Sequence, residues 1–210
     1  MWQQSTGNIA MVKYRVSHAD HLSQPWQVHD LLPDFVVEDV WQFPARLRPE
    51  DTLADFRREM FAAVREFSSF GPAGLLFKVR GAIGRLLGWD DGSDASPPRS
   101  IRRRYESGYP DAGPAPALDG SGFAPVYSLP DEYLGEIENK TVVAALHLAR
   151  TSTEGGYAPR LAVYVMPKGR LGRFYMALIK PFRHWIVYPA LLRATTRRWN
   201  AFAASRLLPE

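Results

Sequence analysis

A long amphipathic segment near the C-terminus restricts the fold of this chain more than any other feature of its sequence. From residue 169 onward, apolar side chains fall on one arc of a helical wheel, which is the pattern of a helix packed against a core. These side chains are Leu171, Phe174, Tyr175, Leu178, Phe182, Trp185, Ile186, Pro189 and Leu192. Pro181 and Pro189 each remove a backbone hydrogen bond, so we expect kinks near them. The sequence therefore predicts a long C-terminal helix whose apolar side needs a covering surface.

The segments just before this helix can supply that surface as a sheet. Four stretches rich in β-branched and aromatic residues follow one another with short turns, which is typical of an antiparallel meander. They are residues 123–129, 132–141, 142–151 and 157–166, and an earlier strand is expected at 35–43. The pattern predicts an α+β fold in which a curved antiparallel sheet wraps around the long C-terminal helix.

The rest of the chain shows helical spacing and loop composition. Apolar residues three and four apart predict a strong amphipathic helix at 53–67, and short-range signals predict a helix at 26–32. A helix containing several glycines is expected at 75–89. The segment 101–105 is expected to be a short strand.

The domain organisation follows from chain length and local composition. A chain of 210 residues fits one domain with one sizeable core. We expect a flexible N-terminal arm at 1–22 and a single domain at 23–205. Within that domain, residues 90–122 are rich in Gly and Pro and are expected to form a long loop.

Composition and motifs exclude several classes of site. The chain has no cysteine, so a disulfide, a thiolate nucleophile and a Cys-based zinc site are all excluded. His18, His21 and His29 lie near the N-terminus, but their spacing fits no metal site. Walker A, dinucleotide-binding and nucleophile-elbow motifs do not occur in the sequence. We therefore predict no metal and no cofactor.

The sequence also carries signals about location. The N-terminal residues lack the apolar core of a secretory signal, which predicts a cytoplasmic protein. The longest apolar stretch, 185–192, contains Pro189 and falls far short of the roughly 20 residues that span a bilayer. No transmembrane segment is predicted.

Positive charge is concentrated toward the C-terminus. The net charge is +4, yet residues 161–209 contain no Asp or Glu. Contact with an anionic surface is predicted through Arg170, Arg173, Lys180 and Arg183, although a solvated helix face gives the same pattern. The cluster 102–104 has acidic neighbours and no surrounding nucleic-acid motif, so the sequence does not favour nucleic-acid binding.

Two segments resemble a known family. The first is 132–141 with His147 and Leu148 following, and the second is 163–191; Pro97-Pro98 and Gly113-Pro114 add to the pattern. Together they resemble the bacterial DUF2867 family of uncharacterised proteins. The order of elements is also similar to the helix-grip fold of the START and birch-pollen-allergen (SRPBCC) superfamily. That resemblance implies a cavity between the sheet and the terminal helix, and it implies no activity.

A binding module is the leading functional hypothesis. The cavity would hold a small apolar or lipid-like molecule, because the expected wall is apolar and aromatic. The residues expected to line it are Phe174, Tyr175, Leu178, Phe182, Tyr164 and His147. Ordinary core packing explains the same aromatic residues equally well at this point.

An enzyme on the same scaffold is the alternative, acting for example as a cyclase, dehydratase or hydrolase. His147 lies between Ala145 and Ala149 on one strand face and could act as a base, or could be a hydrogen-bonded core histidine. Glu136 shares a strand face with two other glutamates and could exchange protons, or could lie on a solvated face. Tyr164 completes the set of catalytic candidates, and docking through the basic helix remains a third possibility.

Overall fold

The computed structural model describes residues 14–69, 100–118, 122–138 and 142–206. Its elements in chain order are α2 (His18–Leu22), α3 (Gln27–Leu31), β1 (Val36–Gln42), α4 (Leu53–Ser69), α6 (Ser100–Gly108), β2 (Ala124–Ser128), β3 (Glu132–Glu138), β4 (Val142–Thr153), β5 (Gly156–Pro167), α7 (Gly169–Phe182), the π-helix η1 (Arg183–Val187) and α8 (Tyr188–Ser205).

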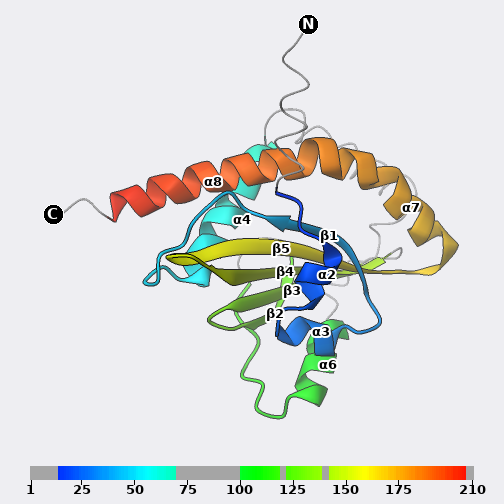
Figure 1. Ribbon diagram of the computed structural model, residues 1–210. Helices are drawn as coiled ribbons and strands as arrows, with labels where there is room; N and C mark the ends of the chain where they lie inside the picture. The colour runs from blue at the N-terminus through cyan, green and yellow to red at the C-terminus, as the bar shows by residue number, and fades with distance from the viewer. Residues whose placement is uncertain (1–13, 70–99, 119–121, 139–141, 207–210) are drawn as a thin grey trace, which may run out of the picture.

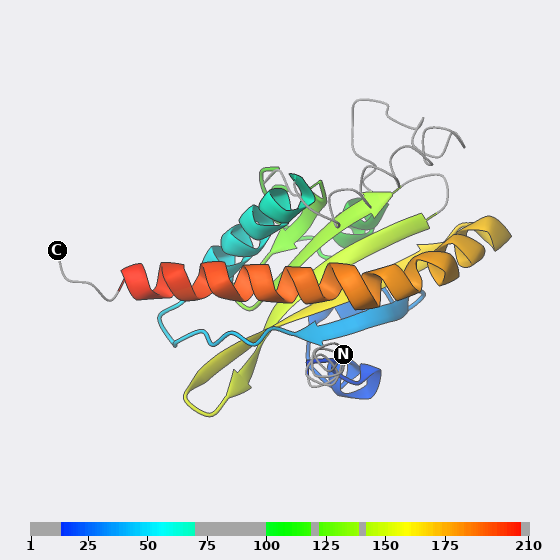
Figure 2. The same cartoon turned by 90° about the horizontal axis from the view of Figure 1, so that it is seen from above.

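The five strands form one antiparallel sheet in the order β1-β5-β4-β3-β2. Strands β2 to β5 are the expected meander, and β1 pairs with the remaining edge of β5. The sheet is curved, and the helices α7 and α8 run across one of its faces (Figures 1 and 2). The predicted α+β fold, with a curved antiparallel sheet and a long C-terminal helix, is therefore confirmed.

Side chains fill the space between the sheet and α8. Alternate residues of the strands point toward this face, because successive side chains of a strand lie on opposite sides. Leu148 and Leu161 from the sheet pack with Phe56 of α4 and Trp199 of α8, and Trp199 is fully buried. The ring centroids of Phe56 and Trp199 are 5.4 Å apart. This face is a packed hydrophobic core.

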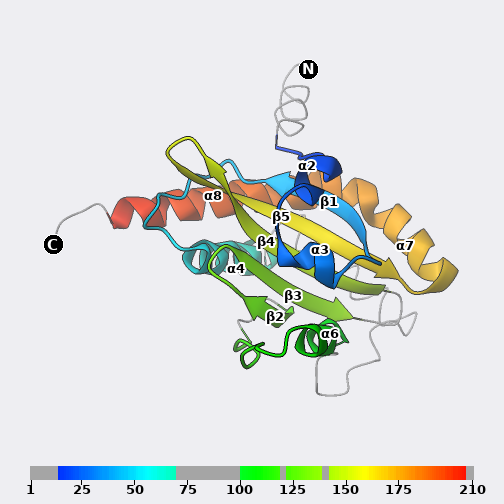
Figure 3. The same ribbon diagram turned by 60° about the horizontal axis from the view of Figure 1, so that its bottom comes forward.

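The opposite face of the sheet is covered by the short helices α2 and α3 and by α6 (Figure 3). Its core contains apolar residues such as Trp26, Leu31 and Ile101. It also contains several buried polar residues, which the face under α8 does not show to the same extent. The polar side of the sheet is thus the side away from the terminal helix.

Two local expectations differ from the structure. Residues 101–105 lie in a helix, α6, because Glu136 of β3 binds the amide groups of its first turn. Residues 14–22, expected in the flexible arm, pair with β1 and contain α2. The expected helix at 75–89 lies outside the described residues.

The long C-terminal helix contains a wide turn. Residues 183–187 form the π-helix, directly before Pro189. Pro189 has no N–H to donate toward the preceding turn, and a locally wider turn accommodates its ring. Within the described residues, no helix is both long and apolar enough to cross a membrane.

Candidate functional site

Tyr164 of β5 joins two histidines on the face away from α8. Its hydroxyl lies 2.8 Å from Nε2 of His21 and 3.0 Å from Nδ1 of His29. A phenol donates one hydrogen bond and accepts others, so Tyr164 can donate to one imidazole and accept from the other. The strand parity places Tyr164 on this face, and α2 and α3 bring the two histidines to it.

Glu132 of β3 forms the second half of the site. Its carboxylate accepts hydrogen bonds from the amides of Gln27 at 2.9 Å and Val28 at 3.0 Å, at the start of α3. It also accepts from the hydroxyl of Tyr127 and lies 3.2 Å from Nε2 of His147. Because no side chain of its own caps α3, this distant carboxylate holds the helix on the sheet.

The two halves meet in one buried cluster, which we call the His-Tyr-Glu cluster and define as His21, His29, Tyr127, Glu132, His147 and Tyr164. The ring centroids of His21 and His147 are 5.5 Å apart, and Trp26 packs against both at 5.0 and 5.1 Å. Each histidine keeps one buried ring nitrogen without a hydrogen-bond partner among the described residues. Such atoms are costly to bury, so they mark a place where a polar group is expected to bind.

Burial controls the protonation of the cluster. Burial, followed by the nearby His147 and His29, lowers the pKa of His21 to about 2. Burial likewise lowers the pKa of His29, and burial together with Glu132 raises the pKa of Tyr164 above its usual value. Burial alone would raise the pKa of Glu132, but hydrogen bonds from His147 and Tyr127 outweigh it and hold that pKa below 4.5. At neutral pH the cluster therefore contains neutral His21, His29 and Tyr164 and one carboxylate.

A pocket of about 270 Å³ adjoins the cluster. Its wall is mainly apolar, and its polar members are His18, His29 and Tyr164. The apolar lining residues are Leu22, Leu32, Pro33, Phe35, Val36 and Val37. Leu22 is 52% exposed and Val36 is 59% exposed, so the rim offers apolar surface to solvent. The pocket thus has an apolar entrance and a mainly apolar lining, with polar groups from His18, His29 and Tyr164.

The polar side chains of the His-Tyr-Glu cluster are better suited to hydrogen bonding than to binding a metal ion. In the part of the chain that the structure describes, no group of three or more His, Cys, Asp or Glu residues is arranged to hold a metal ion. The one proton of Tyr164 is shared with the two histidines, whereas Nε2 of His29 has no hydrogen-bond partner among the described residues. This ring nitrogen, positioned by Tyr164, can bind an oxygen-bearing group or exchange a proton with it.

The structure brings some predicted site residues together and separates others. His147 and Tyr164 lie in one cluster, with ring centroids 6.1 Å apart. Glu136 is buried elsewhere on β3, where both its oxygens accept amides of α6; burial, the largest influence, raises its pKa. The side chains of Phe174, Tyr175 and Leu178 lie outside the described residues. Phe182 is 48% exposed on α7, across the sheet from His147.

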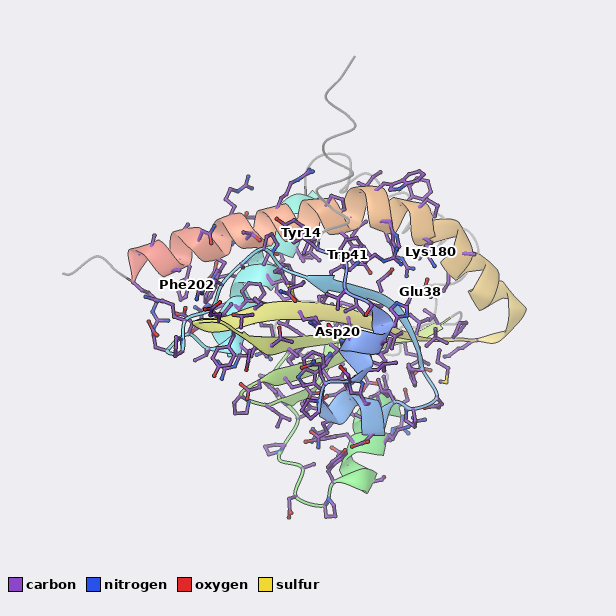
Figure 4. The ribbon with its side chains drawn as sticks, in the orientation of Figure 1. Tyr14, Asp20, Glu38, Trp41, Lys180 and Phe202 are labelled. Atoms are coloured by element: carbon purple, nitrogen blue, oxygen red, sulfur yellow. The ribbon has the colours of Figure 1, made fainter. Side chains whose placement is uncertain are left out.

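The predicted anion-binding residues are partly used inside the fold. Arg183 lies 2.8 Å from Glu38 and 3.3 Å from Asp39, and Lys180 lies 3.7 Å from Glu38 (Figure 4). The side chains of Arg170 and Arg173 lie outside the described residues. Two of the four predicted cations therefore bind β1.

Sequence reasoning assigned no role in the site to His21 or His29. It preferred Glu136 to Glu132 and Tyr164 to Tyr127, although Glu132 and Tyr127 were among the wider candidates. Glu132 and His147 could have been found from the hairpin register, since Leu134 pairs with His147 and places Glu132 diagonally across from it. His21 gives no such signal, because α2 has only five residues and is positioned by contacts with the sheet.

Comparison with known proteins identifies a family and no activity. Residues 31–190 match the family model described as "Protein of unknown function (DUF2867)". No curated protein and no solved structure matches the chain.

Proposed function

The chain belongs to the DUF2867 family, whose description assigns no activity, and we propose that it binds a small molecule with an apolar body and one oxygen-bearing group. The site is the pocket beside the His-Tyr-Glu cluster. The observation that carries the proposal is the hydrogen-bonded pair of Tyr164 and His29 in the wall of an otherwise largely apolar pocket. Ligand sites commonly combine an apolar lining with a few placed polar groups.

The size of the pocket restricts the ligand. Drug-sized ligands occupy pockets of roughly 300–1,000 Å³, and this one has about 270 Å³. A single ring or a short chain fits that space. The exposed apolar rim at Leu22 and Val36 favours an apolar body, and Tyr164 with His29 favours a hydroxyl or carbonyl group at its inner end.

The proposal keeps the helix-grip scaffold and changes the face that holds the ligand. The curved sheet and terminal helix support placing the chain in the START-like superfamily. The wall that the sequence predicted lies on α7, where the side chains of Phe174, Tyr175 and Leu178 lie outside the described residues, and the space under α8 is occupied by side chains such as Trp199. We assign the ligand to the opposite face, because the pocket beside the His-Tyr-Glu cluster lies there, under α2 and α3.

A pair of matched probes tests this assignment. Phenol and toluene have nearly the same shape, and only phenol has a hydroxyl group. Titration followed by histidine side-chain NMR should show that phenol binds more tightly and shifts the resonances of His29. Tyr164→Phe should weaken phenol binding about three- to tenfold, the worth of one hydrogen bond, and leave toluene binding unchanged.

Two further variants complete the test. Leu22→Trp should obstruct the entrance and weaken both probes, and the exposure of Leu22 keeps the fold tolerant of the change. Tyr105→Phe removes a hydroxyl from the same face away from the pocket lining and serves as the control. Equal affinity of phenol and toluene, or no saturable binding, would disprove the proposed site.

Acid–base catalysis is the second candidate function. Its supporting observation is the continuous chain from His29 through Tyr164 to His21, which could move a proton. Two of the catalytic residues suggested by the sequence, His147 and Tyr164, also converge here. A reaction would appear as turnover that Tyr164→Phe abolishes, whereas a binding protein returns the ligand unchanged.

A further inference from the structure

The side of the C-terminal helix that faces away from the sheet carries an unusual set of exposed residues. Phe182 is 48% exposed and Trp185 is 70% exposed. Arg193 and Arg197 are also exposed, further along α8. At 1.5 Å per residue these four positions extend over about 22 Å. We call them the outer stripe; Figure 2 looks down on this side of the helix.

Ion pairs between the C-terminal helix and its neighbouring elements do not neutralise the arginines of the outer stripe. The cations that face the neighbouring elements each meet a carboxylate of β1, α4 or the loop before α4. These pairs are Lys180 with Glu38, Arg183 with Glu38 and Asp39, Arg198 with Glu59 and Glu66, and Arg206 with Asp51 and Asp55. Arg193 and Arg197 have no ion pair with any described residue, and residues 161–209 contain no Asp or Glu.

We propose that the outer stripe docks the protein on an anionic lipid membrane. Two arginines that form no ion pair with a described residue attract a negative surface, and Trp and Phe side chains favour the interface between headgroups and acyl chains. The inner side of α8 stays packed on the sheet through Trp199 and Leu192, so the helix lies flat and only its outer side chains enter the lipid. The aromatic pair favours a membrane over a nucleic acid, which arginines alone would not distinguish.

Vesicle flotation tests the proposal with the full-length protein. Vesicles of phosphatidylcholine and phosphatidylglycerol in equal parts should bind it, and binding should weaken in high salt. Vesicles of phosphatidylcholine alone should bind it much less. Each of Arg193→Gln and Arg197→Gln should weaken partitioning about fivefold, and Trp185→Ser about tenfold.

Control variants separate this surface from general charge and hydrophobicity. Arg103→Gln changes an exposed arginine on α6, and Leu118→Ser changes an exposed apolar residue remote from α8. Neither should alter flotation. Brominated lipid should quench tryptophan fluorescence in the wild type and much less in Trp185→Phe.

The outcomes are distinguishable from those of the ligand proposal. None of the stripe residues lines the pocket, so phenol binding should be the same in every stripe variant. Absent flotation, or flotation that the stripe variants do not reduce, would overturn membrane docking. Binding to duplex DNA that depends on the same arginines, without vesicle binding, would overturn it too and assign the stripe to nucleic acid.

Discussion

The hydroxyl of Tyr188 donates a hydrogen bond of 2.8 Å to Oδ2 of Asp39. Nε2 of His184 lies 2.5 Å from the other oxygen of the same carboxylate. Asp39 is on β1, next to a bulge in its pairing with β5, and it is almost fully buried. A buried carboxylate must be paired, and here its partners all come from the helix. Asp39 therefore fixes the edge strand to the wide turn of the C-terminal helix.

Replacement of Asp39 should destabilise the whole domain. Asp39→Ala removes the carboxylate and leaves Nε2 of His184 and the Tyr188 hydroxyl without their partner. We expect a loss of about 3–5 kcal/mol in the free energy of unfolding, measured by urea denaturation. Tyr188→Phe removes one hydrogen bond and should cost only about 1 kcal/mol. Equal costs for the two variants would contradict this account.

Replacement of Glu132 should release α3 from the sheet. Glu132→Ala removes the acceptor for two amides and the partner of Tyr127 and His147, so the expected loss is about 2–4 kcal/mol. Hydrogen exchange should show early opening of Gln27–Leu31. Glu138→Gln, which breaks a partly exposed pair with Lys168, should cost less than about 1 kcal/mol. An unchanged exchange rate in α3 would count against the capping role.

Stability should fall as the pH drops below 6.5. His21 binds a proton near pH 6.5 when unfolded and only near pH 2 when folded, so between these values the unfolded state holds more protons. Stability therefore rises with pH across this window and is lost on acidification, by about 1.4 kcal/mol per pH unit for one proton. Glu132, whose folded pKa is below 4.5, adds a further loss below that value.

Variants separate the contribution of His21 to that slope from the contribution of His29, whose pKa burial also lowers. Urea unfolding from about pH 7 to about pH 5 should give a slope that is smaller by about one proton in His21→Gln. Leu22→Ala, which changes an exposed neighbour of His21 without removing a titratable group, should keep the wild-type slope. If both variants kept it, another group would be responsible.

Trp199 should be the main anchor of α8. Its ring is fully buried against Phe56, and its Nε1 donates to the carbonyl oxygen of Arg46 at 2.9 Å. Trp199→Ala should cost about 3–5 kcal/mol, measured by thermal or urea unfolding. Asn200→Ala, at the exposed neighbouring position, should change stability by no more than about 0.5 kcal/mol. A small effect of Trp199→Ala would show that the helix is held elsewhere.

Local patterns predicted the elements that local physics determines. The apolar spacing of Leu53, Phe56 and Met60 indicated α4, and β-branched runs separated by short turns indicated β2 to β5. Helix α6 was predicted as a strand because its segment is basic and short, and the carboxylate that caps it comes from Glu136, far along the chain. The contact between Glu136 and α6 is a tertiary contact, which the local sequence of α6 does not indicate.

The orientation of the terminal helix shows the same limit. The helical wheel drawn from the sequence, at 100° per residue, predicted that Phe182 and Trp185 face the sheet and that Arg183 faces away from it. In the structure Arg183 reaches Glu38 and Asp39, while Phe182 and Trp185 are exposed. The wide turn and the acidic pair on β1 decide this rotation, and neither can be recognised from helical periodicity. The sequence predicted only part of the His-Tyr-Glu cluster for a similar reason. Strand parity indicates His147 and Tyr164, but it does not indicate which helices pack over them.

The wide turn at Arg183–Val187 has a consequence for how the chain can vary in length. A regular helix that lost or gained one residue would rotate everything beyond that point by about 100°. Here the π-helix takes up one extra residue in a wider turn, so α8 keeps its phase relative to α7 in one unbroken helical run. Each can present its own inner side to the sheet. A one-codon deletion inside the turn would therefore restore regular winding, and it would leave Tyr188 and Trp199 facing the residues that hold them.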